Sequence, residues 1–437
     1  MSKPKRHYLI IFLILAALQL IVLSQSAQGP ELENPDALAI DKSDTAWMIV
    51  ATAFVLFMTP GLSFFYGGMV SARNVISTML QSFIALGVVS LLWYLVGFSL
   101  AFGDSIGGFI GNPLTFFSFK NVGLAPHPDF APTFPFLLFA LFQLKFAIIT
   151  PALITGSFAE RVKFSSYLIF MCLFSLLIYA PLAHWTWHPE GFLRNWGVLD
   201  FAGGTVVHMS AGFAALAGAF VLGKRAELKT SPANIPFIIL GTGMLWFGWF
   251  GFNAGSALAA DGLAVQAFAT TTMASASAMI TWVLFDALVG RKISAIGACI
   301  GAVVGLVAIT PAAGFVTIGQ STFIGFIAAI ISNLAVYYKS RTSLDDTLDV
   351  FPCHGLGGIV GMLLTAVFAA DVGLIYGETE TFKYHVIALF IVAGFTFGGS
   401  FLIYKVTGMI TTLRVTQEEE RIGLDISQHN ESLHEAA

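Results

Sequence analysis

Residues 203–222, GGTVVHMSAGFAALAGAFVL, form an apolar stretch with His208 inside it. A second stretch, residues 350–370, VFPCHGLGGIVGMLLTAVFAA, places His354 among glycines in the same way. Each stretch has the length of roughly 20 apolar residues that a bilayer-spanning helix needs. An ionisable side chain inside a bilayer is costly and is seldom kept without a function. These two segments therefore predict a membrane protein with a polar path through an apolar conduit.

The composition of the whole chain agrees with a membrane protein. Of its 437 residues, 57% are hydrophobic and 11% are charged, and the mean hydropathy is +0.82. Soluble domains carry roughly 25% charged residues. The net charge of −4 does not indicate a nucleic-acid partner. Three cysteines without a C-x-x-C spacing indicate neither a disulfide framework nor a metal site, and we expect no cofactor.

Eleven apolar stretches are long enough to cross a bilayer, which predicts an all-α polytopic membrane protein. They are residues 46–70, 75–102, 134–156, 164–185, 203–222, 235–254, 263–289, 293–310, 315–338, 350–370 and 384–410. Two groups of five have opposite orientations if the chain crosses the membrane each time. We therefore expect a 5+5 inverted repeat plus one extra C-terminal helix, an arrangement that transporters often use.

The basic residues in the loops predict the orientation. Alternate loops hold ten lysines and arginines against four in the other set, and the richer set is expected to be cytoplasmic. The mature N-terminus is then outside and the C-terminus inside. A basic start, an apolar stretch at 8–23 and small residues at 24–26 resemble a signal peptide, with an uncleaved first helix as the alternative. The predicted organisation is a signal peptide at 1–26, an extracytoplasmic tail at 27–45, a membrane domain at 46–411 and a cytoplasmic tail at 412–437.

The two histidines admit more than one interpretation. His208 lies eight residues after Asp200, about 12 Å along a helix at 1.5 Å per residue, which places it near the middle of the membrane. Two unrelated core histidines, each bonded to a backbone carbonyl, are the simplest alternative. Ligation of a haem by both histidines is another, although no second pair is present. Their matching positions in the two halves favour a shared functional role.

Aromatic and hydroxyl side chains near the predicted outer ends of spans form a second candidate group. An aromatic face attracts a cation, and a hydroxyl oxygen accepts a hydrogen bond, so Trp187 and Ser256 suit a small hydrogen-bonding cation. An aromatic belt at the membrane interface is the alternative for tryptophan. Phe146 and Phe252, facing a pore, would exclude water. Lys145 is the clearly mid-span lysine, and we expect it at a helix or subunit contact.

Several segments strongly resemble the Amt/Mep/Rh ammonium transporter family, on its Amt branch. The resemblance covers residues 46 to about 432, and its most specific string is DFAGGTVVH at 200–208. Further matching strings are PGLSFFYGG at 60–68, FAIITPAL at 146–153, FAER at 158–161, GWFGFNAGS at 248–256, DVFPCHG at 349–355, and LRV, EEER and GLD between 413 and 425.

The resemblance implies a homotrimer in the plasma membrane, with one pore through each eleven-helix protomer and ammonium or ammonia as cargo. It also makes a PII-type regulator on the cytoplasmic face a candidate partner. By position, it assigns an outer ammonium site to Phe146, Trp187 and Ser256, a gate to Phe146 and Phe252, support of the site to Asp200, and the pore to His208 and His354.

The expected mechanism follows from the similar size and charge of ammonium and potassium. Ammonium can lose a proton, and neutral ammonia crosses apolar space at little cost, whereas any ion pays heavily. We expect deprotonation below the phenylalanines and a relay through the histidines. The sequence leaves open whether transport carries net charge. An ammonium sensor with little flux is the alternative; an intramembrane enzyme is not expected, because no activated nucleophile is evident.

Overall fold

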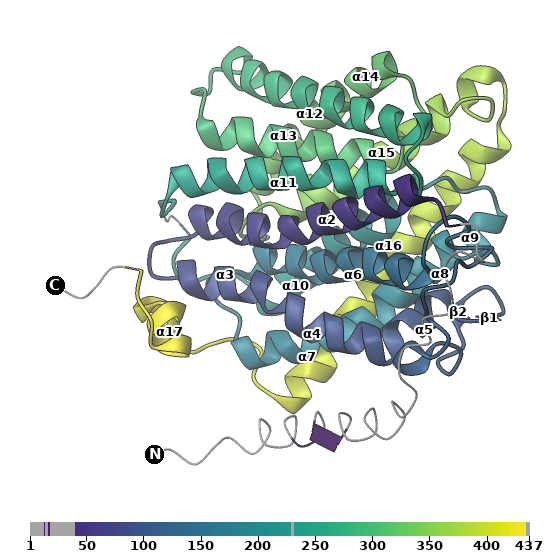
Figure 1. Ribbon diagram of the computed structural model, residues 1–437. Helices are drawn as coiled ribbons and strands as arrows, with labels where there is room; N and C mark the ends of the chain where they lie inside the picture. The colour runs from purple at the N-terminus through teal and green to yellow at the C-terminus, as the bar shows by residue number, and fades with distance from the viewer. Residues whose placement is uncertain (1–12, 14–15, 18–39, 229–230, 434–437) are drawn as a thin grey trace.

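Long helices laid side by side make up the computed structural model (Figure 1), which describes residues 13, 16–17, 40–228 and 231–433. The predicted signal peptide at 1–26 lies outside the described residues except for 13 and 16–17. Of the predicted tail at 27–45, only residues 40–45 are described, and the first long helix begins there at Lys42. Ten described helical segments are long and apolar enough to cross a membrane, and α13 is apolar but shorter. The prediction of an all-α polytopic membrane protein is confirmed.

The first five membrane segments are partly interrupted by π-helical turns. They are α2 (Lys42–Met69); α3 (Val75–Phe83) with α4 (Ala85–Leu92), η2 (Trp93–Gly97) and α5 (Phe98–Phe102); α6 (Phe136–Phe158); α7 (Phe164–Phe174) with η4 (Ser175–Tyr179), α8 (Ala180–Trp187) and the short α9 (Phe192–Asn195); and η5 (Gly204–Met209) with α10 (Ser210–Leu222).

The second group of five is followed by one long helix. The segments are α11 (Ile235–Gly255), α12 (Gly262–Leu288), α13 (Ala295–Ile309), α14 (Ile318–Lys339), and η6 (Phe351–Gly355) with α15 (Leu356–Phe368), and the additional helix is α16 (Glu380–Ile410). Each group ends in a π-helical turn that carries a histidine and leads into an α-helix. The predicted division into five, five and one segments is therefore present along the chain.

Short elements mark the two ends of the bundle. At one end lie the strands β1 (Ser105–Ile106) and β2 (Ile110–Gly111) and the 3₁₀ turns η3 (Phe117–Phe119) and η7 (Leu374–Tyr376). At the opposite end lie α17 (Gln417–Ile422) and η8 (Asp425–His429), as Figure 1 shows for α17 and the strands. We call these the hairpin end and the tail end.

A close backbone crossing brings the two halves together. A Cβ atom at Gly212 on α10 would collide with Gly355 at the end of η6. Glycine therefore lets these two backbones touch, as small residues do between membrane helices. Since His208 lies one turn before Gly212 and His354 directly precedes Gly355, this crossing places the two histidines opposite each other.

Among the described membrane segments α13 is the shortest, although its ends lie within two residues of those predicted. Residues 293–310 were expected to cross, but α13 covers only Ala295–Ile309, about 22 Å at 1.5 Å per residue. Ser294 caps its first turn by accepting a hydrogen bond from Gly297 N at 3.0 Å. At its other end Thr310 and Pro311 lie inside the bundle, and the Thr310 side chain is fully buried. The end of α13 therefore lies in the interior of the bundle and not at its surface.

Candidate functional site

Asp200 holds the start of η5 in place. Its Oδ1 atom accepts hydrogen bonds from Gly203 N at 2.8 Å and Gly204 N at 2.6 Å. Its Oδ2 atom accepts from Thr205 N at 2.7 Å and from Thr205 Oγ1 at 2.5 Å. Backbone donors at a helix start are otherwise without partners, so a carboxylate there stabilises the turn. Asp200 thus fixes the segment that carries His208, and its oxygens are fully engaged.

A cavity of about 350 Å³ at the hairpin end brings several predicted site residues together. We call it the wide cavity, and its lining includes Phe146, Trp187, Asp200 and Ser256. The Trp187 indole N–H donates to the Asp200 carbonyl at 3.1 Å, which orients the ring. The Ser256 hydroxyl donates to the Phe252 carbonyl at 2.8 Å. Its lone pairs therefore remain available to an N–H donor.

Two phenylalanines whose rings are in close, tilted contact lie between the wide cavity and the histidines. The ring centroids of Phe146 and Phe252 are 4.2 Å apart, and both side chains are buried. Trp187 meets Phe146 edge-on with centroids 5.8 Å apart. On the other side, the Phe252 ring lies 6.1 Å from the ring of His208. Aromatic rings thus form a dry barrier between the cavity and the histidines.

The two predicted pore histidines are in direct contact. His208 Nδ1 and His354 Nδ1 are 3.3 Å apart, and the ring planes differ by 27°. Both side chains are almost fully buried, at 1% and 3% exposure. Trp249 also stacks on His208, with ring centroids 5.4 Å apart. A shared hydrogen bond between two imidazoles requires that one Nδ1 carries a proton and the other does not.

Thr310 determines which nitrogen carries the proton. Its hydroxyl donates to the Leu306 carbonyl at 2.8 Å and accepts from Trp249 Nε1 at 2.9 Å. With its one proton used, it can only accept from His208 Nε2, which lies 3.2 Å away. Neutral His208 is therefore protonated on Nε2 and accepts at Nδ1. It follows that His354 donates from Nδ1 and keeps Nε2 as an acceptor.

A much smaller space lies beyond His354. This narrow chamber has a volume of about 10 Å³ and is bordered by His354, Cys353, Tyr66 and Leu348, among others. A volume of this size holds about one water molecule. The Tyr66 hydroxyl donates to the Leu153 carbonyl at 2.9 Å, so its oxygen can still accept. The path therefore narrows from the wide cavity to a space for one small molecule.

Sequence reasoning did not identify all residues of this path. Thr310 follows a glycine- and valine-rich helix, and nothing in its local pattern distinguishes it from other buried threonines. Trp249 lies within the matching string at 248–256, but its bond to Thr310 depends on tertiary contact. Gln143 also lines the wide cavity. Lys145 is half-buried and makes no hydrogen bond or ion pair with any described residue, so its contact role stays a prediction.

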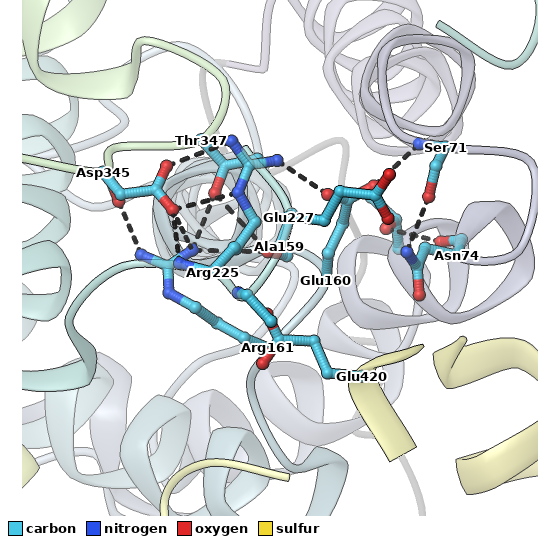
Figure 2. A network of polar contacts seen from close by, with 12 residues as sticks. Ser71, Asn74, Ala159, Glu160, Arg161, Arg225, Glu227, Asp345, Thr347 and Glu420 are labelled. Atoms are coloured by element: carbon cyan, nitrogen blue, oxygen red, sulfur yellow. Dashed lines mark hydrogen bonds and ion pairs between the residues drawn. The ribbon is translucent and has the colours of Figure 1, made fainter. Parts of the chain in front are cut away.

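A buried ionic network occupies the tail end. Arg225 donates to Asp345 at 3.0 and 3.1 Å and to Glu160 at 2.6 Å, and Figure 2 shows it between these two carboxylates. Glu160 also accepts from Ser71 N at 2.7 Å. The fully buried Arg161 donates to the Asp345 carbonyl at 2.6 Å. The network joins loops that follow four different membrane segments.

The charges of this network support one another. Burial opposes the charge of Asp345, but hydrogen bonds from Arg225 and the charge of Arg161 outweigh it and lower the pKa of Asp345. The pKa of Glu160 is also lowered, because the Ser71 amide and Arg225 outweigh burial. Burial lowers the pKa of Arg161 to about 10, against the attraction of Asp345. These groups are ionised at neutral pH and act as structural ties.

The C-terminal segment is bound to the same face. Glu420 accepts from Ala226 N at 2.5 Å and pairs with Arg414 at 2.7 Å. Asp425 accepts from Ser77 N at 2.7 Å, and so holds the first turn of α3. Val415 N donates to the Arg161 carbonyl at 3.1 Å. The tail therefore rests directly on the ionic network.

Known proteins share this whole architecture. The model of the Ammonium Transporter Family matches residues 46–433. A putative ammonium transporter of Methanothermobacter thermautotrophicus is 46% identical over 405 residues, covering 90% of this chain and 99% of that protein. An ammonium transporter of Aquifex aeolicus is 46% identical over 400 residues, covering 90% and 93%.

Solved structures agree with the sequence relatives. The crystal structure of Saccharomyces cerevisiae Mep2 has a TM-score of 0.82 at 34% identity, covering 87% of this chain and 89% of that one. A structure titled Sensor Amt Protein has a TM-score of 0.81 at 30% identity, covering 89% and 98%. The chain therefore belongs to the Ammonium Transporter Family, and its function is ammonium transport.

Proposed function

We propose that ammonium is recruited in the wide cavity, loses a proton beside Phe146 and Phe252, and continues as ammonia past His208 and His354. The continuous contact series from Trp187 to His354 carries this proposal. Ammonium is attracted by the Trp187 face and donates to Ser256. No cofactor takes part in this scheme, and it involves no covalent chemistry, so the protein acts as a transporter and not as an enzyme.

The dry segment provides selectivity against potassium. The two ions have similar size and charge, so the wide cavity alone separates them weakly. Beyond Phe252, a charge has no acceptor until it reaches the histidines, and a charge in an apolar interior is costly. Ammonium avoids this cost by giving up its proton and crossing as ammonia, which potassium cannot do.

The histidine pair offers a route for the proton. His208 accepts at Nδ1 and donates at Nε2, and His354 has a free acceptor at Nε2 in the assigned tautomers. Imidazole both accepts and donates, so both rings must first exchange tautomers, which frees His208 Nε2 as the acceptor. A proton from ammonium then binds His208 Nε2, the Nδ1 proton of His208 passes to His354 Nδ1, and His354 releases its Nε2 proton, which restores the assigned tautomers. Net charge then moves with each ammonia. Without such exchange, the same path would carry ammonia alone.

The orientation places the wide cavity outside. The loops at the tail end contain Arg73, Arg161 and Arg225, and basic loops remain in the cytoplasm. The plasma membrane is the proposed location, with an outer N-terminus after cleavage of residues 1–26 and a cytoplasmic C-terminus. Labelling of single introduced cysteines in intact cells tests this: a cysteine at position 109 should react, and one at position 418 should not.

Assembly and regulation follow from the family resemblance. We propose a homotrimer with a separate pore in each protomer, and native mass spectrometry of the purified protein measures its size. The bound tail and the basic loops beside it form the surface on which a PII-type regulator would dock. Loss of regulator binding after removal of residues 412–437, with a regulator from the same organism, would support this site.

A sensor with little flux is the second candidate, favoured by the similarity to the protein titled Sensor Amt Protein. Purified protein in liposomes separates the two. Transport predicts an ammonium-dependent current or an internal pH change that saturates with concentration and is absent with potassium. Saturable ammonium binding without either signal would identify a sensor. Wild-type potassium flux equal to that of ammonium would contradict the dry path.

A further inference from the structure

Asp129 contributes an exposed carboxylate to the lining of the wide cavity, but few of the buried polar groups there have a free hydrogen-bond acceptor. Both carboxylate oxygens of Asp200 are engaged by the start of η5. The Thr205 hydroxyl donates to Asp200, and Thr186 lies 3.4 Å from that hydroxyl. Ammonium has four N–H donors that need partners once water is removed. The single hydroxyl of Ser256 cannot replace all the water molecules that accept these N–H donors.

Gln143 is the remaining buried polar group in this lining. It lies three residues before Phe146 on α6, so both side chains share a helix face. Its side chain is 8% exposed, and it borders the wide cavity together with Trp187 and Ser256. Among the described residues, none forms a hydrogen bond with its Oε1 atom. A buried oxygen without a partner is unfavourable, and a ligand that donates a hydrogen bond removes this penalty.

We propose that Gln143 is a further substrate-binding residue, whose amide oxygen accepts an N–H of ammonium opposite Ser256. The proposal rests on the proposed transport function and adds a specificity group to it. Trp187 then supplies attraction for the charge, and the two oxygens supply direction. The amide contributes to binding above the phenylalanines and has no part in proton transfer at the histidines.

The test compares variants of Gln143 in liposomes and in ammonium titration of purified protein by calorimetry. Gln143→Leu should raise the half-saturating ammonium concentration about tenfold, the effect of one lost hydrogen bond to a charged group, with the maximal current unchanged. Gln143→Glu keeps an acceptor and should restore affinity. Its affinity should also become pH-dependent and increase as the new carboxyl ionises.

A matched control is Gln266→Leu, because Gln266 lies on α12 and donates to the Val316 carbonyl, away from the cavity lining. It should leave half-saturation unchanged.

If Gln143→Leu folds poorly, Gln143→Met, which fills the site without an amide, replaces it. Wild-type half-saturation in these apolar variants, or a lower maximal current at unchanged half-saturation, would overturn the proposal. An ammonium affinity of the Gln143→Glu variant that does not change with pH would also overturn the proposal. If the wild type binds ammonium but carries no current, the proposed transport route is wrong. Calorimetry then still shows whether Gln143 contributes to ammonium binding.

Discussion

Two buried polar clusters in this protein are built in opposite ways. The pair of His208 and His354 lies in the membrane interior, uncharged in its assigned tautomers and joined by one mutual hydrogen bond. The network of Arg161, Arg225 and Asp345 lies at the tail end and carries full charges in multiple bonds. The histidine pair keeps one free hydrogen-bond acceptor, His354 Nε2. The ionic network has its charges paired with one another.

Because of this difference, substitutions in the two clusters should affect different properties, namely transport in one and stability in the other. A buried ion pair is strongly destabilising when one partner is removed, because a charge is left unpaired. A neutral imidazole can be replaced with less disturbance, but a proton route is lost with it. We therefore expect substitutions in the network to affect folding first and substitutions in the pair to affect current first. The following four experiments measure that separation, from the largest effect to the smallest.

Asp345→Asn should lower the free energy of unfolding by about 3–5 kcal/mol, because it leaves Arg161 and Arg225 without their shared carboxylate. The lowered pKa of Asp345 means that its contribution is present above the unfolded value of 3.8 and is lost as pH falls through the folded value. Thermal unfolding of the wild type in detergent should therefore lose stability below about pH 4, and the variant should lose less there. Lys383→Gln, in an exposed pair with Glu380, serves as control and should change nothing measurable.

His208→Ala should reduce the ammonium-dependent current by at least about a hundredfold, the range expected for loss of a positioned proton carrier. The same holds for His354→Ala. Melting temperature and abundance should change little, unlike Asp345→Asn. His127→Ala, in a loop at the hairpin end, is the matched control. Unchanged current together with unchanged potassium exclusion in both histidine variants would contradict the proposed proton relay.

Trp187→Leu should raise half-saturating ammonium about tenfold, within the roughly 0.5–2 kcal/mol of a cation–aromatic contact. The maximal current should stay close to wild type, because the histidines are untouched. Current as a function of ammonium concentration gives both values. An identical concentration dependence would count against the aromatic site.

Thr310→Val should lower the maximal current about fivefold, since one neutral hydrogen bond contributes about 1 kcal/mol. Valine has nearly the same shape but cannot accept from His208 Nε2 or Trp249, so the imidazole tautomer is no longer fixed. Nitrogen NMR of labelled histidine should show mixed tautomers in the variant and one in the wild type. A single unchanged tautomer would mean that Thr310 does not set it.

Sequence reasoning reached the fold and much of the site for different reasons. Hydrophobic length identifies a span directly, so the eleven stretches and the extra C-terminal helix were predictable. The histidines were noticeable because they interrupt apolar segments. Thr310 and Gln143 were not noticeable, because Thr310 meets His208 and Trp249 only in the folded protein, and Gln143 lines the wide cavity only there. α13 was predicted to within two residues at each end, because its apolar length is visible in its own composition.

The narrow chamber limits what can accompany the cargo. A space for about one molecule leaves no room beside the cargo for a second molecule or for a hydration shell. Two small molecules cannot pass each other there, so exit in one direction excludes entry from the other during the same event. Any ion entering this chamber would have to shed its bound water, whereas a single small neutral molecule would fit without such a loss.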